Sequence, residues 1–425
     1  MKPLLLAAAV CLAACTDVPD SDSLATNESA LSVTFQREHV TADIYHYVAR
    51  ISVGVGPNAA IRVHRIVREV APFVPRPTHH AAMLLHGDFS TFVTNFAPSL
   101  GTAASSAPGL APYLAAHDID VWGLDRRWTL PGTNDSIADF GSMGLVQELD
   151  DLRAALVLAR AVRAAGGAGA DRIALIGFSH GAELAYAYAA SEGSRPALSR
   201  NASALVAFDF YGDFGADSAD LKAATCETAR QEYELVAGGV TDAPNDFFIT
   251  AGELAASAPD DASPLIPNKT NQQAMWLLVG QTYKLAPFAP GYHLLAPVLG
   301  SNGKPTGLRL TSDAASNAWF AGATPHQSMI EAADLDAYLC GEAPPIVAPL
   351  SNIHVPLYYV GAAGGIGAFG LHATTQVSST DVTTHIIQQL PAGQQLSDVG
   401  HGDLLLADAA RSLVWQPLVT WLVGH

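Results

Sequence analysis

The chain has 425 residues, which is too long for one ordinary domain and predicts a core domain with a large insertion. Only 15% of its residues are charged, which excludes long disordered charged tails. Its 22 basic and 40 acidic residues give a net charge of −18, which excludes nucleic-acid binding through neutralisation of phosphates.

The chain begins like an export signal. Lys2 precedes an apolar run that is about half the roughly 20 residues needed to cross a bilayer. The run ends in Leu12-Ala13-Ala14-Cys15, which resembles a bacterial lipobox and implies lipidation of Cys15. A plain signal peptide is the alternative. We therefore expect a lipoprotein signal at 1–15 and a flexible tether at 16–30. The residue after Cys15 is Thr16 and not the aspartate that resembles an inner-membrane retention signal. We therefore expect an exported protein on the outer membrane or cell surface.

Strand patterns begin after the tether. Two alternating segments separated by glycine and proline predict an antiparallel pair at a sheet edge, and six continuous apolar runs predict strands buried on both faces of a parallel sheet. The alternating segments are Ile44–Val53 and Ile61–Arg68, and the apolar runs are Ala81–Leu85, Ile119–Leu124, Ile173–Ile176, Ala204–Phe208, Val355–Val360 and Thr384–Gln388.

Helical patterns at Gln147–Ala165 and Gly181–Ala190 lie between these runs, so the core should be a doubly wound α/β sheet. About 140 residues separate Asp213 from the next buried strand, too many for a loop. This stretch contains two further helical segments. We therefore predict a core at 31–214 and 351–425, interrupted by a cap at 215–350.

The chain has four cysteines. Cys11 would be removed with the signal, and Cys15 would carry lipid. Cys226 and Cys340 remain, near the two ends of the predicted cap. In an oxidising compartment they should form a disulfide, and two unpaired buried thiols are the alternative.

The strongest chemical signal is Gly177-Phe178-Ser179-His180-Gly181, between a buried strand and a helix. A sharp turn at this place would hold the hydroxyl of Ser179 exposed at the end of the sheet, as a nucleophile requires. The strained turn needs small neighbours, which Gly177 and Gly181 provide. The positive end of the following helix would face a developing oxyanion.

His86-Gly87-Asp88 follows the apolar strand Ala81–Leu85. A loop in this position supplies one oxyanion amide, and the residue after the nucleophile supplies the other. We therefore assign the backbone amides of Asp88 and His180 to the oxyanion site. The carboxylate of Asp88 would have to point away from the oxyanion.

Near the C-terminus, Asp398-Val399-Gly400-His401-Gly402-Asp403 follows the last predicted strand. His401 comes after Ser179 in the chain, which is the order found when a histidine acts as base for a serine on such a sheet. We expect His401 to accept the proton of Ser179 and return it to the leaving group.

These three features together resemble the α/β-hydrolase family, in its serine esterase and lipase branch. The resemblance covers about 44–213 and 352–421 and not the insertion. It implies a mostly parallel sheet with helices on both faces and a cap between the sixth and seventh core strands. It also implies catalysis without a cofactor, and no cysteine and histidine cluster has the spacing of a zinc site.

The acid of the triad departs from the family pattern. The family usually places it after the strand that precedes the last, but here Val355–Val360 runs into a glycine-rich loop without a carboxylate. A minority of lipases place it one strand earlier, which corresponds to Asp209. A carboxylate at the carboxyl end of a strand points toward the active-site edge, so Asp209 is our first choice. Asp381 and Asp213 are alternatives.

The predicted activity is hydrolysis of a small-molecule or lipid ester through an acyl-enzyme on Ser179. Aromatic and apolar residues in the insertion suit an apolar substrate group, although they also suit a cap core. A peptidase or amidase of the same fold is the nearest alternative, and an inactive, surface-anchored binding protein is the third. We expect a monomer that contacts the membrane through its lipid and binds no nucleic acid.

Overall fold

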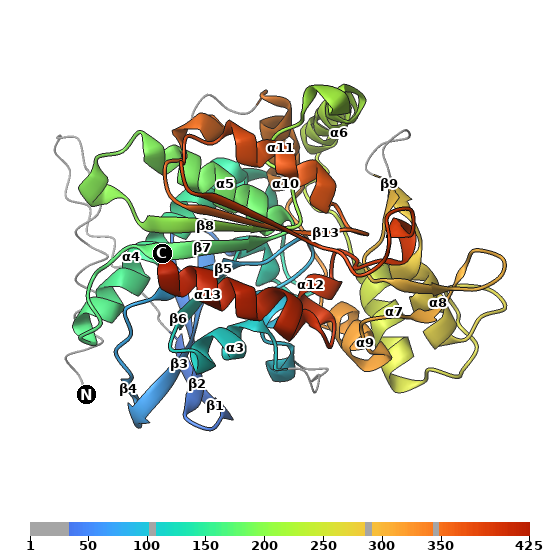
Figure 1. Cartoon of the computed structure of the whole chain (residues 1–425), viewed down its shortest axis with the longest axis horizontal. Coiled ribbons are helices and arrows are strands. Elements are labelled where there is room, and N and C mark those ends of the chain that lie inside the picture. Colours follow the sequence, from blue (N-terminus) through green and yellow to red (C-terminus); the bar gives the residue numbers. More distant parts are fainter. Residues whose placement is uncertain (1–33, 102–107, 285–290, 343–347) are drawn as a thin grey trace.

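A computed structural model describes residues 34–101, 108–284, 291–342 and 348–425. Its centre is a ten-stranded sheet in the order β1-β2-β3-β6-β5-β7-β8-β13-β14, with β4 paired to β3 (Figure 1). The predicted signal, lipidation site and tether lie outside the described residues. Within the described residues, no helix is long and apolar enough to span a membrane.

The first part of the sheet is antiparallel, as predicted from the alternating segments. β2 and β3 pair from Ile44 with Arg68 to Ser52 with Ala60, and β1, which the sequence analysis did not predict, adds to the edge. The strands are β1 (Thr34–Thr41), β2 (Ile44–Ser52), β3 (Ala60–Ala71) and β4 (Val74–Pro75).

The second part is parallel, and every residue of four of its strands is buried. All six predicted apolar runs are strands: β5 (Ala81–Leu85), β6 (Asp120–Asp125), β7 (Ile173–Phe178), β8 (Ala202–Phe208), β13 (Leu357–Ala362) and β14 (Val382–Ile387). Their carboxyl ends therefore meet at one edge, which is where residues that follow the strands converge.

Helices cover both faces of this sheet. Along β5, Ala82 and Leu84 belong to one apolar cluster, while Ala81, Met83 and Leu85 belong to the other. The first cluster includes α2 (Phe92–Phe96), α3 (Leu110–Ala116) and α13 (Gln416–Gly424). The second includes α4 (Leu145–Ala165), α5 (His180–Gly193) and α11 (Gly367–Gln376).

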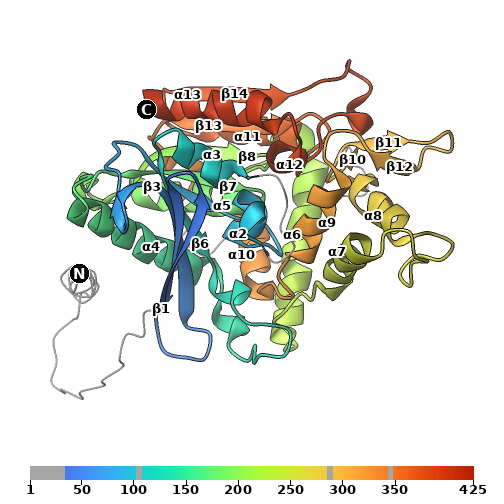
Figure 2. The same cartoon turned by 90° about the horizontal axis from the view of Figure 1, so that it is seen from below.

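The segment between β8 and β13 forms a group of helices and two short β-hairpins beside the carboxyl edge of the sheet (Figure 2). The helices are α6 (Ala219–Ala237), α7 (Asp246–Ser257), α8 (Asn271–Gly280), α9 (Asp313–Ala321) and α10 (Met329–Cys340). The hairpins pair β9 (Tyr283–Lys284) with β10 (Gly291–Tyr292), and β11 (Pro297–Leu299) with β12 (Pro305–Leu308). Its role as a cap stays a prediction.

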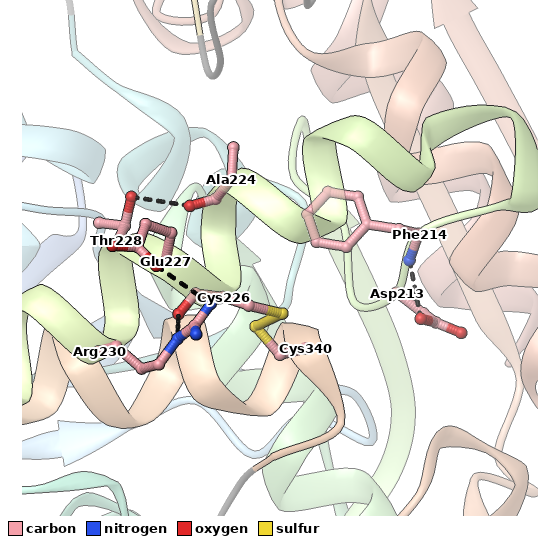
Figure 3. Close-up of a disulfide and its surroundings, with 8 residues drawn as sticks. All are labelled: Asp213, Phe214, Ala224, Cys226, Glu227, Thr228, Arg230 and Cys340. Carbon is pink, nitrogen blue, oxygen red and sulfur yellow. Dashed lines mark hydrogen bonds and ion pairs between the residues drawn. A yellow bond between two sulfur atoms is a disulfide. The ribbon is translucent and has the colours of Figure 1, made fainter.

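The predicted disulfide is present between Cys226 of α6 and Cys340 of α10, whose Cα atoms lie 5.4 Å apart (Figure 3). The two helices pack along each other, and the bond joins them across 114 residues of sequence. It therefore ties the first helix of the insertion to the last, close to where both connect to the core.

Candidate active site

Ser179 lies in the turn between β7 and α5, with φ of 56° and ψ of −133°. A positive φ is unfavourable for a residue with a side chain and marks a strained, functional turn. A Cβ on Gly177 would lie 2.1 Å from the carbonyl oxygen of Gly181. A Cβ on Gly181 would lie 2.2 Å from the oxygen of Leu85, so both neighbours must be glycine.

His401 lies in the loop before α12 (Asp403–Leu406), and its ring stacks on that of Phe178 at 4.6 Å. Its Nδ1 donates a hydrogen bond of 2.7 Å to Oδ2 of Asp209. This bond fixes the tautomer that leaves Nε2 free to accept a proton. Ser179 and His401 are 8% and 5% exposed, so the site is nearly closed to solvent.

Asp209 directly follows β8 and is completely buried. The backbone amides of Ala362 and Ile366 donate to its two carboxylate oxygens at 2.6 and 3.0 Å. A Cβ on Gly365 would lie 2.3 Å from Oδ2 of Asp209. The glycine-rich loop after β13 therefore wraps around the carboxylate, which accounts for the absence of an acid in that loop.

The alternative acids lie away from His401. Asp213 accepts a hydrogen bond from the amide of Phe214, and its other oxygen lies 3.8 Å from Nε2 of His372. Asp381 precedes β14 and contacts Nε2 of His425 at 3.0 Å, at the amino end of the strands. Of the three candidates, the structure brings only Asp209 to His401.

The loop after β5 lies against the nucleophile. A Cβ on Gly87 would lie 2.9 Å from Cβ of Ser179, and the amide of Gly87 donates to the side-chain oxygen of Asn95 at 2.9 Å. Across the part of the chain that the structure describes, the amides of Asp88 and His180 have no hydrogen-bond acceptor. Both amides are therefore available to an oxyanion.

The side chains of the two predicted oxyanion residues contact each other. His180 Nδ1 donates to the carboxylate of Asp88, and Nε2 lies 2.9 Å from Oε2 of Glu183. Burial opposes a charge on His180, but the carboxylates of Asp88 and Glu183 raise its pKa well above its usual value. The carboxylate of Asp88 therefore contacts a histidine whose surroundings favour its protonated form.

The insertion also contacts the loop after β5, through residues that the sequence analysis missed. Gln327, before α10, donates to the carboxylate of Asp88 at 2.5 Å. Arg126 donates to the carbonyls of His86 and Gly87 at 3.0 and 3.1 Å and pairs with Glu331 of α10 at 2.5 Å. The position of Arg126 directly after β6 was the one signal in the sequence.

The insertion positions His401 as well. The amide of His401 donates to the carbonyl of His293 at 3.0 Å, and that of Gly402 donates to Leu294 at 2.7 Å. Trp319 packs against Gly402, where a Cβ would lie 2.9 Å from its ring. Trp319 and Phe320 are among the aromatic residues of the insertion, and they lie beside the site with their rings 5.1 Å apart.

No model of a protein family matches the chain, and no curated protein matches it. Among the described residues, no group of three or more histidine, cysteine or acidic side chains could hold a metal ion.

Solved structures do resemble this one. A candidate lipase from Sulfolobus solfataricus matches with a TM-score of 0.60 and 14% identity, over 92% of this chain and 99% of that chain. Epoxide hydrolase A from Mycobacterium thermoresistibile matches with a TM-score of 0.46 and 13% identity, over 92% of this chain and 99% of that chain. A soluble variant of monoglyceride lipase from Saccharomyces cerevisiae matches with a TM-score of 0.45 and 12% identity, over 93% of this chain and 96% of that chain. The first match shows a shared fold, and the lower-scoring two add nothing to it. The predicted α/β-hydrolase fold is confirmed.

Proposed function

We propose that this chain, which has the α/β-hydrolase fold, is a serine hydrolase that cleaves carboxylic esters through an acyl-enzyme. Ser179 is the nucleophile, His401 the general base and Asp209 the acid that orients it. The backbone amides of Asp88 and His180 bind the oxyanion. The hydrogen bond of 2.7 Å between His401 and Asp209, at the edge where the strained turn presents Ser179, is the observation that carries this proposal.

In the first half of the reaction, Oγ of Ser179 attacks the ester carbonyl while Nε2 of His401 accepts its proton. The two free amides stabilise the negative charge that develops on the carbonyl oxygen. Asp209 stabilises the imidazolium that forms on His401. The imidazolium then protonates the departing alkoxide, which leaves Ser179 acylated.

In the second half, a water molecule takes the place of the alcohol. His401 accepts a proton from the water as it attacks the acyl carbonyl, and the same two amides bind the oxyanion. Return of the proton to Oγ of Ser179 releases the carboxylic acid and restores the enzyme. Trp319 and Leu295, which pack on Gly402 beside His401, suit an apolar group on the substrate.

The test is labelling with a fluorophosphonate probe, followed by a panel of p-nitrophenyl esters and aminoacyl-anilides. We expect labelling at Ser179 and turnover of esters. Turnover of anilides alone would show a peptidase instead. A folded protein that the probe leaves unlabelled would favour a non-catalytic binding protein instead.

We also propose that the protein is exported and anchored to a bacterial membrane through Cys15. This proposal rests on the lipobox-like Leu12-Ala13-Ala14-Cys15, and the disulfide between Cys226 and Cys340 supports an oxidising compartment. Metabolic labelling with a fatty acid should mark the wild-type chain and not Cys15→Ser. Equal labelling of the two would reject the anchor.

A further inference from the structure

A chain of hydrogen bonds runs from the surface to the end of β6, across four neighbouring strands. Oε1 of Glu38 on β1 lies 2.6 Å from Nδ1 of His46 on β2, and Nε2 of His46 lies 2.9 Å from Nδ1 of His64 on β3. Nε2 of His64 lies 3.0 Å from Oδ2 of Asp125, the last residue of β6. We call these four side chains the histidine chain. None of them belongs to the proposed triad or oxyanion site.

The inner part of the histidine chain is closed to water. His46 and His64 are each 2% exposed and Asp125 is completely buried, whereas the side chain of Glu38 is 54% exposed. Burial of polar and charged groups is costly unless every hydrogen bond is made. Apolar side chains would fill these positions at lower cost, so packing alone does not account for the histidine chain.

The three hydrogen bonds of the histidine chain require three protons. An ionised carboxylate can only accept, so each bond must use an N–H group of an imidazole ring. Two neutral imidazoles carry two N–H groups between them, which is one too few. One of the two rings must therefore be an imidazolium, which donates a hydrogen bond from each of its nitrogens.

The surroundings favour His64 as the charged ring. Burial and the neighbouring His64 lower the pKa of His46 to about 4, so His46 is neutral at physiological pH. Burial opposes a charge on Asp125, but His64 and Arg62, which contacts it at 3.1 Å, lower the pKa of Asp125 below its usual value. Burial also lowers the pKa of His86, the other histidine that faces Asp125, to about 3. The inner end of the histidine chain is thus a carboxylate paired with His64.

This carboxylate holds α2. Oδ1 of Asp125 accepts a hydrogen bond of 2.7 Å from the amide of Phe92, the first residue of α2, and the ring of Phe92 stacks on that of His64 at 4.6 Å. Asn95 of the same helix accepts a hydrogen bond of 2.9 Å from the amide of Gly87. One short helix therefore joins the histidine chain to the loop after β5, which carries a proposed oxyanion amide.

We propose that the histidine chain positions the oxyanion site. The proton on His64 keeps Asp125 ionised and oriented, Asp125 holds α2, and Asn95 of α2 holds the loop after β5. The members of the histidine chain are positioning residues, because they act through this loop and not on the substrate. The proposal rests on the proposed hydrolase function. A displacement of about 1 Å in such a site can lower the rate by as much as about a hundredfold.

The test compares His46→Phe with His46→Gln in the full chain. Phenylalanine fills the space but cannot accept the hydrogen bond of His64, whereas the side-chain oxygen of glutamine can. For a p-nitrophenyl ester, we expect His46→Phe to lower kcat about tenfold with KM unchanged, and His46→Gln to stay within about twofold of the wild type. The affinity of a boronic acid inhibitor, whose tetrahedral adduct occupies the oxyanion site, should fall by the same factor as kcat.

A variant at the exposed end of the histidine chain tests the same link without disturbing the core. Glu38→Ala removes the outer acceptor and should lower kcat about threefold with KM unchanged. Gln36→Ala is the matched control, because Gln36 is exposed two residues away on the same strand, and it should retain the wild-type rate. Circular dichroism checks that each variant is folded.

A wild-type rate in His46→Phe, an equal loss of kcat in His46→Phe and His46→Gln, or a change in KM alone would overturn the proposal. The protons are counted in ¹⁵N spectra of the histidine rings, where only one ring nitrogen of the pair, Nε2 of His46, should lack a proton near pH 7. Two such nitrogens in His46 and His64 would also overturn it. These spectra need no turnover, so a wild-type chain without esterase activity would reject the proposed function separately.

Discussion

At the scale of single residues, the proposed triad depends on how the carboxylate of Asp209 is held. Asp209 accepts hydrogen bonds from His401 and from two backbone amides, and no part of it is exposed. Its own φ of 50° is positive, like that of Ser179. Two strained residues at the ends of adjacent strands indicate that this edge is arranged for chemistry.

We predict that Asp209→Asn lowers kcat about 10⁴-fold with little change in KM. An amide can donate to Nδ1 and so favour the tautomer whose Nε2 carries a proton and cannot act as base. Steady-state kinetics on a p-nitrophenyl ester measures the loss. Asp213→Asn and Asp381→Asn are the matched controls and should retain wild-type rates. A larger loss of kcat in either control than in Asp209→Asn would assign the role of triad acid to that residue.

Ser179→Ala should abolish fluorophosphonate labelling and lower kcat by roughly 10⁶-fold, because serine and its base act as one unit. Labelling followed by peptide mapping locates the adduct. Alanine keeps the same backbone strain, so the fold should persist in circular dichroism. An adduct that persists in this variant would exclude Ser179 as the nucleophile.

At the scale of elements, the insertion holds two loops of the site. Gln327 precedes α10 and contacts the loop after β5 directly, through Asp88. Glu331 lies in α10 and supports the same loop through Arg126. Backbone carbonyls at 293 and 294 bind the loop of His401. An insertion with these contacts contributes to the geometry of catalysis as well as to the choice of substrate.

Gln327→Ala should lower kcat about tenfold and change KM little, because the carboxylate of Asp88 loses a donor and its amide moves from the oxyanion position. Gln231→Ala is the matched control, since Gln231 is exposed on α6 of the same insertion. Comparing kcat and KM for the two variants checks this. A rise in KM alone would give Gln327 a role in substrate binding instead.

The disulfide should stabilise the insertion. Replacing Cys226 and Cys340 by serine should lower the free energy of unfolding by about 5 kcal/mol in the chain-entropy model, because the bond closes a long loop of 114 residues. Denaturant unfolding of the variant against wild type measures it. Activity at low temperature should survive. An unchanged unfolding midpoint would mean that the disulfide does not stabilise the protein by restricting the conformations of the unfolded chain.

At the scale of the whole molecule, negative charge is in excess and part of it is buried. The net charge is −18, and carboxyls that are buried or half-buried gather where α5, α6 and α10 meet. Burial raises the pKa of Glu183 to about 7, that of Glu232 to about 7 and that of Asp336 to about 7. The folded state therefore binds these protons more tightly than the unfolded chain.

These raised pKa values fix the sign of what the three carboxyls contribute to the pH dependence of stability. Groups with a raised pKa stabilise the fold fully below their usual pKa of about 4, and this contribution is lost as the pH rises toward 7. We predict that Asp336→Asn raises the melting temperature relative to the wild type by at least about 2 °C more at pH 8 than at pH 5, because an amide stays uncharged. Scanning calorimetry at the two pH values checks it, and an equal shift at both would contradict it.

The sequence by itself determined which segments are buried strands, because continuous apolar runs are buried on both faces only between two layers of helices. Their order in the sheet came from the tertiary structure. It also predicted the nucleophile turn, since a strained turn needs small neighbours and Gly177 and Gly181 provide them. It predicted that Cys226 pairs with Cys340 as well. The edge strand β1 escaped prediction because its exposed residues carry no apolar pattern.

Only the tertiary structure decided which acid reaches His401. Asp209, Asp213 and Asp381 all stand near strand ends in the sequence, and their separation in space depends on which end of the sheet each one occupies. The contacts of Gln327, Arg126 and His293 were equally hidden, because they join segments far apart in the chain. Hydrogen bonds between such segments follow from packing, which no local pattern records.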